Sequence, residues 1–215
     1  MNLAVYTESA ADDIAVRIIA EALIGSATVP ASFQPVGTRG WPAVLHALSA
    51  VLLELHYHSD ADGLVIVVDS DLTETHRAEH DTAPHAHQAC RLCLRRQKVR
   101  HTMSRARPCS HREALRVAIG VAVPAIEAWY LFGKDPRASE ASWAVTRTGD
   151  TFLTVKRALK KAVYGSEVPL GELLSVRAAA EATRISSDLA ALARFFPGGF
   201  APLAEEVGAW RERGQ

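Results

Sequence analysis

Asp69 and Asp71 are two carboxylates, two positions apart, that follow the uninterrupted apolar run of residues 63–68. Such a run predicts a buried strand. Ligand crevices in open α/β sheets lie beyond the carboxyl ends of the strands, where two nearby carboxylates can share a hard cation such as Mg2+. The same Asp-Ser-Asp sequence can also cap a helix or form a turn. On this pair alone, a metal site and a turn are equally good interpretations.

Glu8 adds a third carboxylate in an equivalent place. It follows the apolar residues 3–7, which predict a first strand, and it precedes a stretch with helical spacing of Ile14, Ile18 and Leu23. A further acidic residue, Glu127, comes after the predicted strand 117–123 and just past Pro124, within the first turn of a helix. Its carboxylate can face the same crevice or interact with the helix dipole.

The order of these elements resembles the Toprim fold. A strand, a Glu, a helix, a second strand and helix, and a strand that ends in Asp-x-Asp run through residues 1–135. The Glu127-Ala128-Trp129 sequence is similar to that of an uncharacterised Toprim-like family with a Glu-Ala-Trp motif. Trp129 itself is more typical of core packing than of base stacking. Two departures leave catalytic competence open: Ser9 replaces the usual Gly, and Tyr130 to Gly133 replace a segment that commonly reaches an Asp.

The resemblance implies an activity and partners. It implies a hydrolase, an Mg2+- or Mn2+-dependent nuclease, with Asp69 and Asp71 as metal ligands, Glu8 as a further ligand or general base, and Glu127 as a fourth catalytic residue. Many compact Toprim-like proteins act in bacterial antiphage defence beside an ATPase of the ABC type, so a regulated antiviral role with such a partner is implied as well. The competing hypothesis is a catalytically inactive Toprim-like module that binds a partner ATPase, another copy of the chain or nucleic acid.

Strand and helix signals alternate in the first part of the chain. Strands are predicted near residues 2–7, 28–36, 63–68 and 116–123, and this alternation predicts a parallel sheet flanked by helices, an α/β fold. We expect a Toprim-like domain over residues 1–135, interrupted by an insertion at about residues 72–115. Residues 136–215 read as short helices and are expected to form a helical C-terminal extension packed on that domain.

The insertion is rich in potential zinc ligands, with all three cysteines and six of the nine histidines. His85, His87, Cys90 and Cys93 lie within nine positions and have the side chains of a tetrahedral zinc site. The spacing is irregular, so substitution by Cys109, His101 or His111, or free thiols and solvated histidines, are the alternatives. The stretch from His76 to His80 also matches an inverted zinc-peptidase motif, with Glu79 to activate water. A solvated polar helix is the better interpretation of that stretch.

Basic residues dominate the second half of the insertion. Between residues 91 and 116 only Glu113 is acidic, and the basic residues are Arg91, Arg95, Arg96, Lys98, Arg100, Arg105, Arg107, Arg112 and Arg116. Such a segment attracts a polyanion through counterion release, so the first five are candidate nucleic-acid contacts. A solvated basic helix, or docking onto an acidic protein, is the alternative. Arg39 lies in a Gly-rich loop before a helix, where it can hold a phosphate or remain an ordinary solvated residue.

Composition sets the broad class. The chain has 215 residues, 48% of them hydrophobic, and a formal net charge of zero, which is enough to bury a substantial core. No apolar run approaches the roughly 20 residues that span a bilayer, and no signal segment opens the chain. The cysteines are too few and too clustered for a secreted disulfide framework. We therefore expect a cytoplasmic protein without membrane contact, with a homo-oligomer left open.

Overall fold

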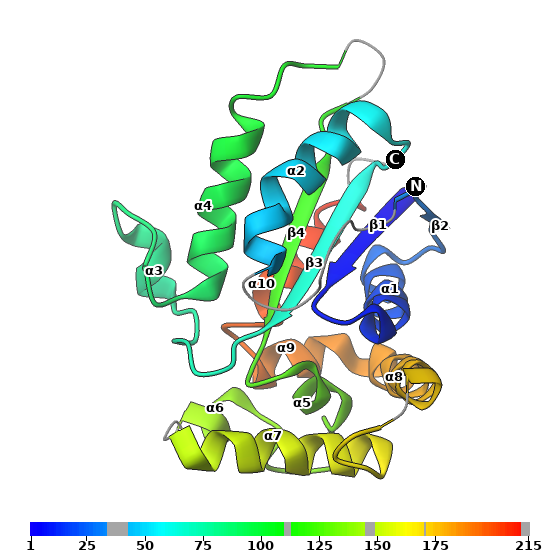
Figure 1. Ribbon diagram of the computed structural model, residues 1–215, viewed down its shortest axis with the longest axis vertical. Helices are drawn as coiled ribbons and strands as arrows, with labels where there is room; N and C mark the ends of the chain where they lie inside the picture. Colours follow the sequence, from blue (N-terminus) through cyan, green and yellow to red (C-terminus); the bar gives the residue numbers. More distant parts are fainter. Residues whose placement is uncertain (34–42, 110–112, 145–148, 170, 212–215) are drawn as a thin grey trace.

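The computed structural model describes residues 1–33, 43–109, 113–144, 149–169 and 171–211 (Figure 1). Its centre is a four-stranded sheet with the order β2-β1-β3-β4, in which every pairing is parallel. The strands are β1 (Asn2–Thr7), β2 (Val29–Pro30), β3 (Gly63–Asp69) and β4 (Arg116–Ala122). The predicted α/β fold with a parallel sheet is therefore confirmed.

The second strand is shorter than predicted. Of the expected range 28–36, only Val29 and Pro30 pair with β1, and both are exposed at the edge of the sheet. Pro30 has no backbone N–H to donate, which suits an edge position and not a long, buried strand. Residues 34–36 lie outside the described part of the chain.

Side chains of β1 and β3 alternate between two cores. Leu3, Val5, Val65 and Val67 face one core, and the residues between them in each strand face the other. The first face is covered by α1 (Ala10–Ile24) and α10 (Ala201–Gly208), and α8 (Gly171–Ile185) packs against α1. The second is covered by α2 (Ala43–His58) and α4 (Arg91–Met103), so the molecule has three layers (Figure 1). Burial on both faces explains why β3 is apolar throughout.

The insertion contributes to the core instead of forming an appendage. It contains a short helix, α3 (Ala78–Thr82), and α4, which packs against α2 and β4. Leu92 is fully buried among the side chains of the second core. A parallel bridge between Glu74 and Cys90 joins the beginning of the insertion to the start of α4. In it the Glu74 N–H donates to the Ala89 carbonyl at 3.0 Å. The start of α4 is thereby held beside the end of β3.

The C-terminal region is helical, as predicted. Its elements are α6 (Glu140–Ala144), α7 (Gly149–Tyr164), α8, η1 (Ser186–Asp188), α9 (Leu189–Phe195) and α10. Leu192, Phe196 and Phe200 are fully buried in the first core. The strands point their carboxyl ends toward α7 and the short α5 (Ile126–Tyr130) (Figure 1). Within the described ranges, no helix has the length and apolarity needed to cross a membrane.

Candidate active site and metal centre

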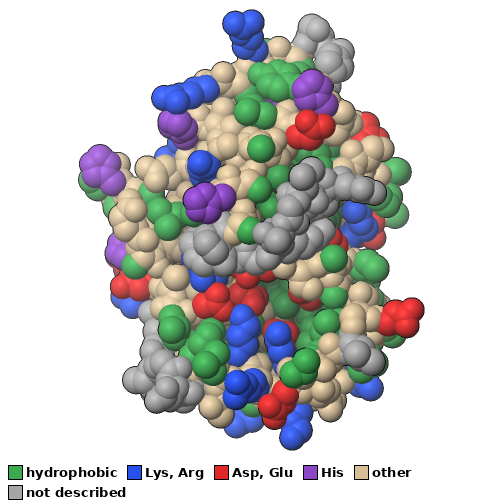
Figure 2. Space-filling model, viewed as in Figure 1, with side chains coloured by type: hydrophobic (Ala, Val, Ile, Leu, Met, Phe, Trp, Pro, Cys, Tyr) green, Lys and Arg blue, Asp and Glu red, His purple; other side chains and the backbone are tan. Residues whose placement is uncertain are grey.

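A small crevice lies beyond the carboxyl ends of β1 and β3. It has a volume of about 220 Å³, and the carboxyl and ammonium groups that line it belong to Glu8, Asp12, Asp69, Glu127, Lys156 and Lys160. Acidic side chains lie next to Lys and Arg side chains below the centre of the face shown in Figure 2. The strands place carboxylates that are far apart in the sequence at one edge of the sheet, among them the candidate residues Glu8, Asp69 and Glu127.

Asp69 is held by one backbone donor and one ammonium group. Its Oδ1 accepts a hydrogen bond from the Ile126 N–H at 3.0 Å, at the start of α5. Its Oδ2 lies 2.8 Å from the Nζ of Lys156. The first contact fixes the carboxylate relative to α5, and the second brings α7 over the end of β3.

Asp71 lies at the rim of the crevice and is also paired. Its Oδ1 accepts from Lys156 at 2.7 Å, and its Oδ2 lies 2.8 Å from the Nη2 of Arg91. Burial alone would raise the pKa of Asp71, but Lys156 and Arg91 outweigh burial and lower it. Asp71 has a φ of 47°, a left-handed conformation that Asp tolerates better than most residues. This turn aims both Asp71 oxygens at cations.

Glu8 is largely buried and shares Arg91 with Asp71. The Nη1 of Arg91 lies 3.7 Å from Glu8 Oε1, and the same nitrogen donates to the Asp69 carbonyl. Burial, followed by the charge of Asp69, raises the pKa of Glu8, and Arg91 offsets only part of this. Ser9, in place of the usual Gly, caps α1 by accepting a hydrogen bond from the Ala11 N–H at 3.3 Å.

Two further carboxyl groups lie deeper in the crevice. Glu127 is 5% exposed, and burial, together with the charges of Asp69 and Asp12, raises its pKa to about 8. Burial and the Asp69 charge raise the pKa of Asp12 to about 7, although the Tyr130 hydroxyl donates to Asp12 Oδ1 at 3.0 Å. Near neutral pH both groups therefore carry a proton for much of the time. Trp129 points away into the core, where it packs edge-on against Phe200, as its sequence context predicted.

The sequence interpretation missed Asp12 and the face of α7 that covers the crevice. Lys156, Lys160 and Tyr164 are spaced by four residues, so they lie on one side of α7. That spacing is visible in the sequence, but nothing local indicates that the helix folds back over the sheet.

The three predicted metal ligands Glu8, Asp69 and Asp71 do not converge closely. Because Lys156 lies between the two aspartates, these residues do not bring three oxygens within 4.8 Å of one another in the part of the chain that the structure describes.

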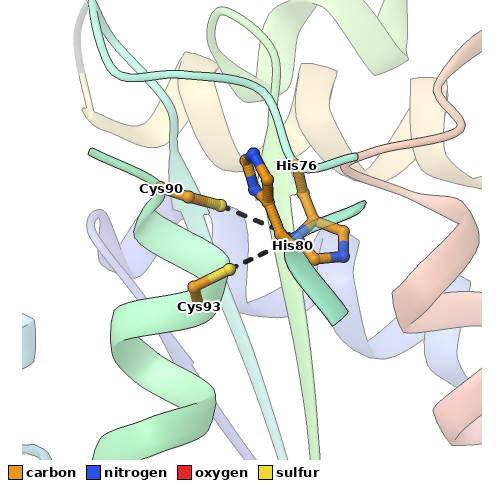
Figure 3. A group of neighbouring side chains, drawn as sticks. All are labelled: His76, His80, Cys90 and Cys93. Carbon is orange, nitrogen blue, oxygen red and sulfur yellow. Dashed lines mark hydrogen bonds between the residues drawn. The ribbon is translucent and has the colours of Figure 1, made fainter. Parts of the chain in front are cut away.

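A separate cluster of metal-binding side chains lies in the insertion. His76, His80, Cys90 and Cys93 each offer one ligand atom, and these atoms lie within 4.8 Å of one another. Both cysteines, at the start of α4, point toward the imidazoles (Figure 3). Burial raises the pKa of the Cys90 thiol to about 12, so without a cation the thiol is protonated. The cluster can hold a zinc ion.

The two histidines predicted as zinc ligands are not the ones that the structure places beside the cysteines. Cys90 and Cys93 do belong to the four-residue cluster, but His76 and His80 take the places that the sequence assigned to His85 and His87. His85 is exposed, and His87 belongs to a second, less buried group with Glu74 and His80. The physical reason is the bridge between Glu74 and Cys90, which folds the chain so that the earlier histidine pair meets the cysteines. Glu79, the water-activating residue of the peptidase motif, is exposed and outside both groups.

Only some of the basic residues predicted to contact nucleic acid are exposed. Arg91 and Arg95 are 4% and 0% exposed, and both point inward, where Arg95 donates to the Arg91 carbonyl at 3.1 Å. Burial, together with the charge of Arg91, lowers the pKa of Arg95 to about 9. Arg96 is paired with Glu206 at 2.8 Å and with Asp81 at 3.2 Å. Lys98 is half-buried and Arg100 is exposed. Arg39 lies outside the described residues.

Comparisons of the chain with protein-family models, with curated proteins and with solved structures found no match. What is shown is an α/β fold with a four-stranded parallel sheet, a His/Cys cluster in the insertion and C-terminal helices that reach the carboxyl ends of the strands.

Proposed function

We propose that the crevice is the active site of a nuclease that hydrolyses nucleic-acid phosphodiesters with the help of a divalent cation. One observation carries this proposal: four carboxyl groups line a partly buried crevice beside only two lysines among its described lining residues. Burial, followed by the charge of Asp69, raises the pKa of Glu8, Asp12 and Glu127, so these groups can be ionised together only if a further cation offsets the negative charge that they would then share. A bound Mg2+ or Mn2+ ion would neutralise it.

The donor set fits a hard cation, because every acidic ligand in the crevice offers oxygen. Asp69 and Glu8 would hold the ion, with Asp12 and Glu127 able to join after losing their protons. When bound, the ion would stabilise negative charge on a phosphoryl oxygen and lower the pKa of a water ligand. Binding requires the Lys156 side chain, which is 22% exposed, to turn away from Asp69 by a change of rotamer.

The residues of the chain supply the other parts of phosphodiester hydrolysis. Lys156 and Arg91 contact different oxygens of the Asp71 carboxylate and are suited to contact the phosphate oxygens that become more negative in the transition state. Glu8, with its raised pKa, suits the role of the base that accepts a proton from the attacking water. Asp71 would hold both cations in place instead of serving as a primary metal ligand.

Nucleic acid is the proposed substrate because Lys98 and Arg100 lie on α4, the helix whose first residue, Arg91, reaches the crevice. A role as a regulated effector of bacterial antiphage defence beside an ABC-type ATPase rests only on the resemblance of the Glu8, Asp69, Asp71 and Glu127 motifs to Toprim proteins. We propose that role as the biological setting of the cleavage.

The test is cleavage of plasmid DNA, single-stranded DNA and RNA by the purified full chain with Mn2+. Asp69→Asn keeps an oxygen for the Ile126 N–H but removes the charge, and Glu172→Gln, an exposed site on α8, is the matched control. We expect the wild type and Glu172→Gln to cut one substrate class and Asp69→Asn to lose at least about 100-fold in rate. Equal rates for all three proteins would contradict the proposal, because the activity would then come from elsewhere.

The second candidate is an inactive module that binds nucleic acid or a partner ATPase. The bridging of Asp69 and Asp71 by Lys156 favours it, because the ammonium group already offsets part of the negative charge of the two predicted ligands. On this view Mn2+ neither binds in the crevice nor supports cleavage, even with a candidate ATPase added. Retention of nucleic-acid binding by Asp69→Asn, with no cleavage by the wild type, would favour this second function.

A further inference from the structure

We propose that His76, His80, Cys90 and Cys93 bind a structural zinc ion that fixes the insertion to the end of the sheet. This proposal does not depend on the proposed nuclease activity. The four residues form a closed set of two imidazoles and two thiols, which matches structural zinc sites and leaves no position for a substrate. Both ligand pairs have spacings found in such sites, with three residues between the histidines and two between the cysteines.

The interatomic distances match a tetrahedral site. With zinc–sulfur bonds of about 2.3 Å and zinc–nitrogen bonds of about 2.0–2.1 Å, the sulfur–nitrogen edge of a tetrahedron is about 3.6 Å. The Nδ1 of His76 lies 3.7 Å from Cys90 Sγ and 3.5 Å from Cys93 Sγ (Figure 3). A single ring nitrogen has at most one proton to donate, so it cannot donate separate hydrogen bonds to both sulfurs.

The outer contacts also match those of a metal-bound histidine. The far nitrogen of His76, Nε2, lies 3.1 Å from Asp81 Oδ2, and the Asp81 carboxylate is in turn contacted by Arg96. A carboxylate on the second ring nitrogen is the usual device that orients a zinc-bound imidazole. His80 Nδ1 is buried without a hydrogen-bond partner among the described residues, as expected of a nitrogen that serves as a metal ligand.

The alternative group of Glu74, His80 and His87 shares His80 with the first set, so the two groups cannot both be filled through that residue. Thiolates and imidazoles favour zinc more strongly than a set with one carboxylate and no sulfur. In the first set, three of the four residues are buried, whereas all three members of the second are only half-buried. The first set is therefore the one we assign.

The site connects α3, and the segment just before it, to the start of α4. His80 lies within α3 and His76 two residues before it, and the cysteines lie at the start of α4. Arg91, which reaches Asp71 and Glu8, lies between the two cysteines in the sequence. Zinc bound here would hold the backbone on both sides of Arg91 and so position its guanidinium at the crevice, which makes the four ligands positioning residues and not catalytic ones.

The first test is the metal content of the full chain, expressed with zinc in the medium and purified without chelator. We expect about one zinc per chain in the wild type, because a structural site is close to full occupancy. His76→Ala and Cys93→Ser should lose at least about 90% of it. His87→Ala and Cys109→Ser are the matched controls, since they remove a histidine of the other group and a cysteine outside both, and they should keep the metal.

The second test needs no folded variant. Wild-type protein stripped of metal and refilled with Co2+ should show the sulfur-to-cobalt charge-transfer absorption of two thiolates, and added Zn2+ should abolish it. In hydrogen–deuterium exchange, zinc should slow exchange over residues 74–93. Less than about one zinc per several chains, loss of zinc in His87→Ala to the same extent as in His76→Ala, or a cobalt complex without thiolate absorption would each overturn the proposal.

Discussion

Lys156 Nζ lies 2.7 Å from Asp71 Oδ1, although the two residues are 85 positions apart in the sequence. The same ammonium group lies 2.8 Å from Asp69 Oδ2, and this double contact, with burial opposing it, raises the pKa of Lys156 above its usual range. A helix from the C-terminal region therefore closes a crevice formed by the N-terminal sheet. This contact also places a cation where a divalent ion would otherwise be attracted.

Replacing Lys156 with Met separates its contribution to folding stability from its competition with a bound metal ion. Lys156→Met removes a charged partner from Asp69 and Asp71 and should lower the free energy of unfolding by roughly 1–3 kcal/mol. Added Mn2+ should then raise the melting temperature more than it does in the wild type, because the ion no longer competes with the ammonium group. Thermal unfolding with and without Mn2+ measures both effects. Lys161→Met, an exposed lysine of the same helix, should change neither.

Arg91 is the second cation whose removal has a large expected effect. Arg91→Gln leaves Asp71 and Glu8 without a guanidinium that is 4% exposed, which should cost about 3–5 kcal/mol in the free energy of unfolding. Arg100→Gln, on the same helix but exposed, should stay within about 0.5 kcal/mol of the wild type. Urea unfolding of the two variants makes the comparison. If both were equally stable, Arg91 would not be a structural partner of these carboxylates.

The raised pKa of Glu127 predicts a pH dependence of stability. Between the ordinary value of 4.5 and about 8, the folded protein holds a proton that the unfolded chain has released. Raising the pH across this window therefore destabilises the folded protein, by at most about 1.4 kcal/mol per pH unit for one group. Glu127→Gln should remove this part of the decline. The check is urea unfolding from pH 5 to 8 without added Mg2+ or Mn2+, and parallel curves for the two proteins would be the contrary result.

Gly198 has no room for a side chain. An added Cβ would lie 2.2 Å from the His76 carbonyl oxygen, so Gly198→Ala must displace the backbone beside the His/Cys cluster. We expect a loss of roughly 1–3 kcal/mol in the free energy of unfolding, together with faster loss of zinc to a chelator. Gly208→Ala is the matched control, because nothing lies within 4 Å of its Cβ and it is in a helix, where Ala is favoured by up to about 1 kcal/mol. Equal stability of the two variants would show that the close contact is absent in solution.

The sheet and the acidic ends of its strands could be predicted because their signals are local. β3 is apolar up to its last residue, Asp69, so consecutive residues alone indicate a buried strand that ends in a carboxylate. Glu8 and Glu127 are similarly attached to the ends of β1 and β4. The parallel arrangement then places the three carboxylates at one edge.

The contacts that complete each site depend on tertiary packing. Lys156 reaches Asp69 only because α7 folds over the end of the sheet. The histidines that face Cys90 and Cys93 are selected by the bridge between Glu74 and Cys90, which is not a local signal. The burial of Arg91 and Arg95 could have been predicted in part from the sequence. Their spacing of four places them on one face of α4, and that face is buried. A count of basic residues that ignores this helical spacing therefore overestimates how many of them are exposed.

The most direct test of the central claim is Mn2+ binding to the zinc-saturated full chain, measured from the electron paramagnetic resonance signal of free Mn2+. The wild type should bind at least one ion, Asp69→Asn should weaken this binding at least about tenfold, and Glu172→Gln should leave it unchanged. If the wild type and Asp69→Asn bound Mn2+ equally, or if the wild type bound none, the crevice would not be a divalent-cation site, and the proposed nuclease mechanism would be wrong.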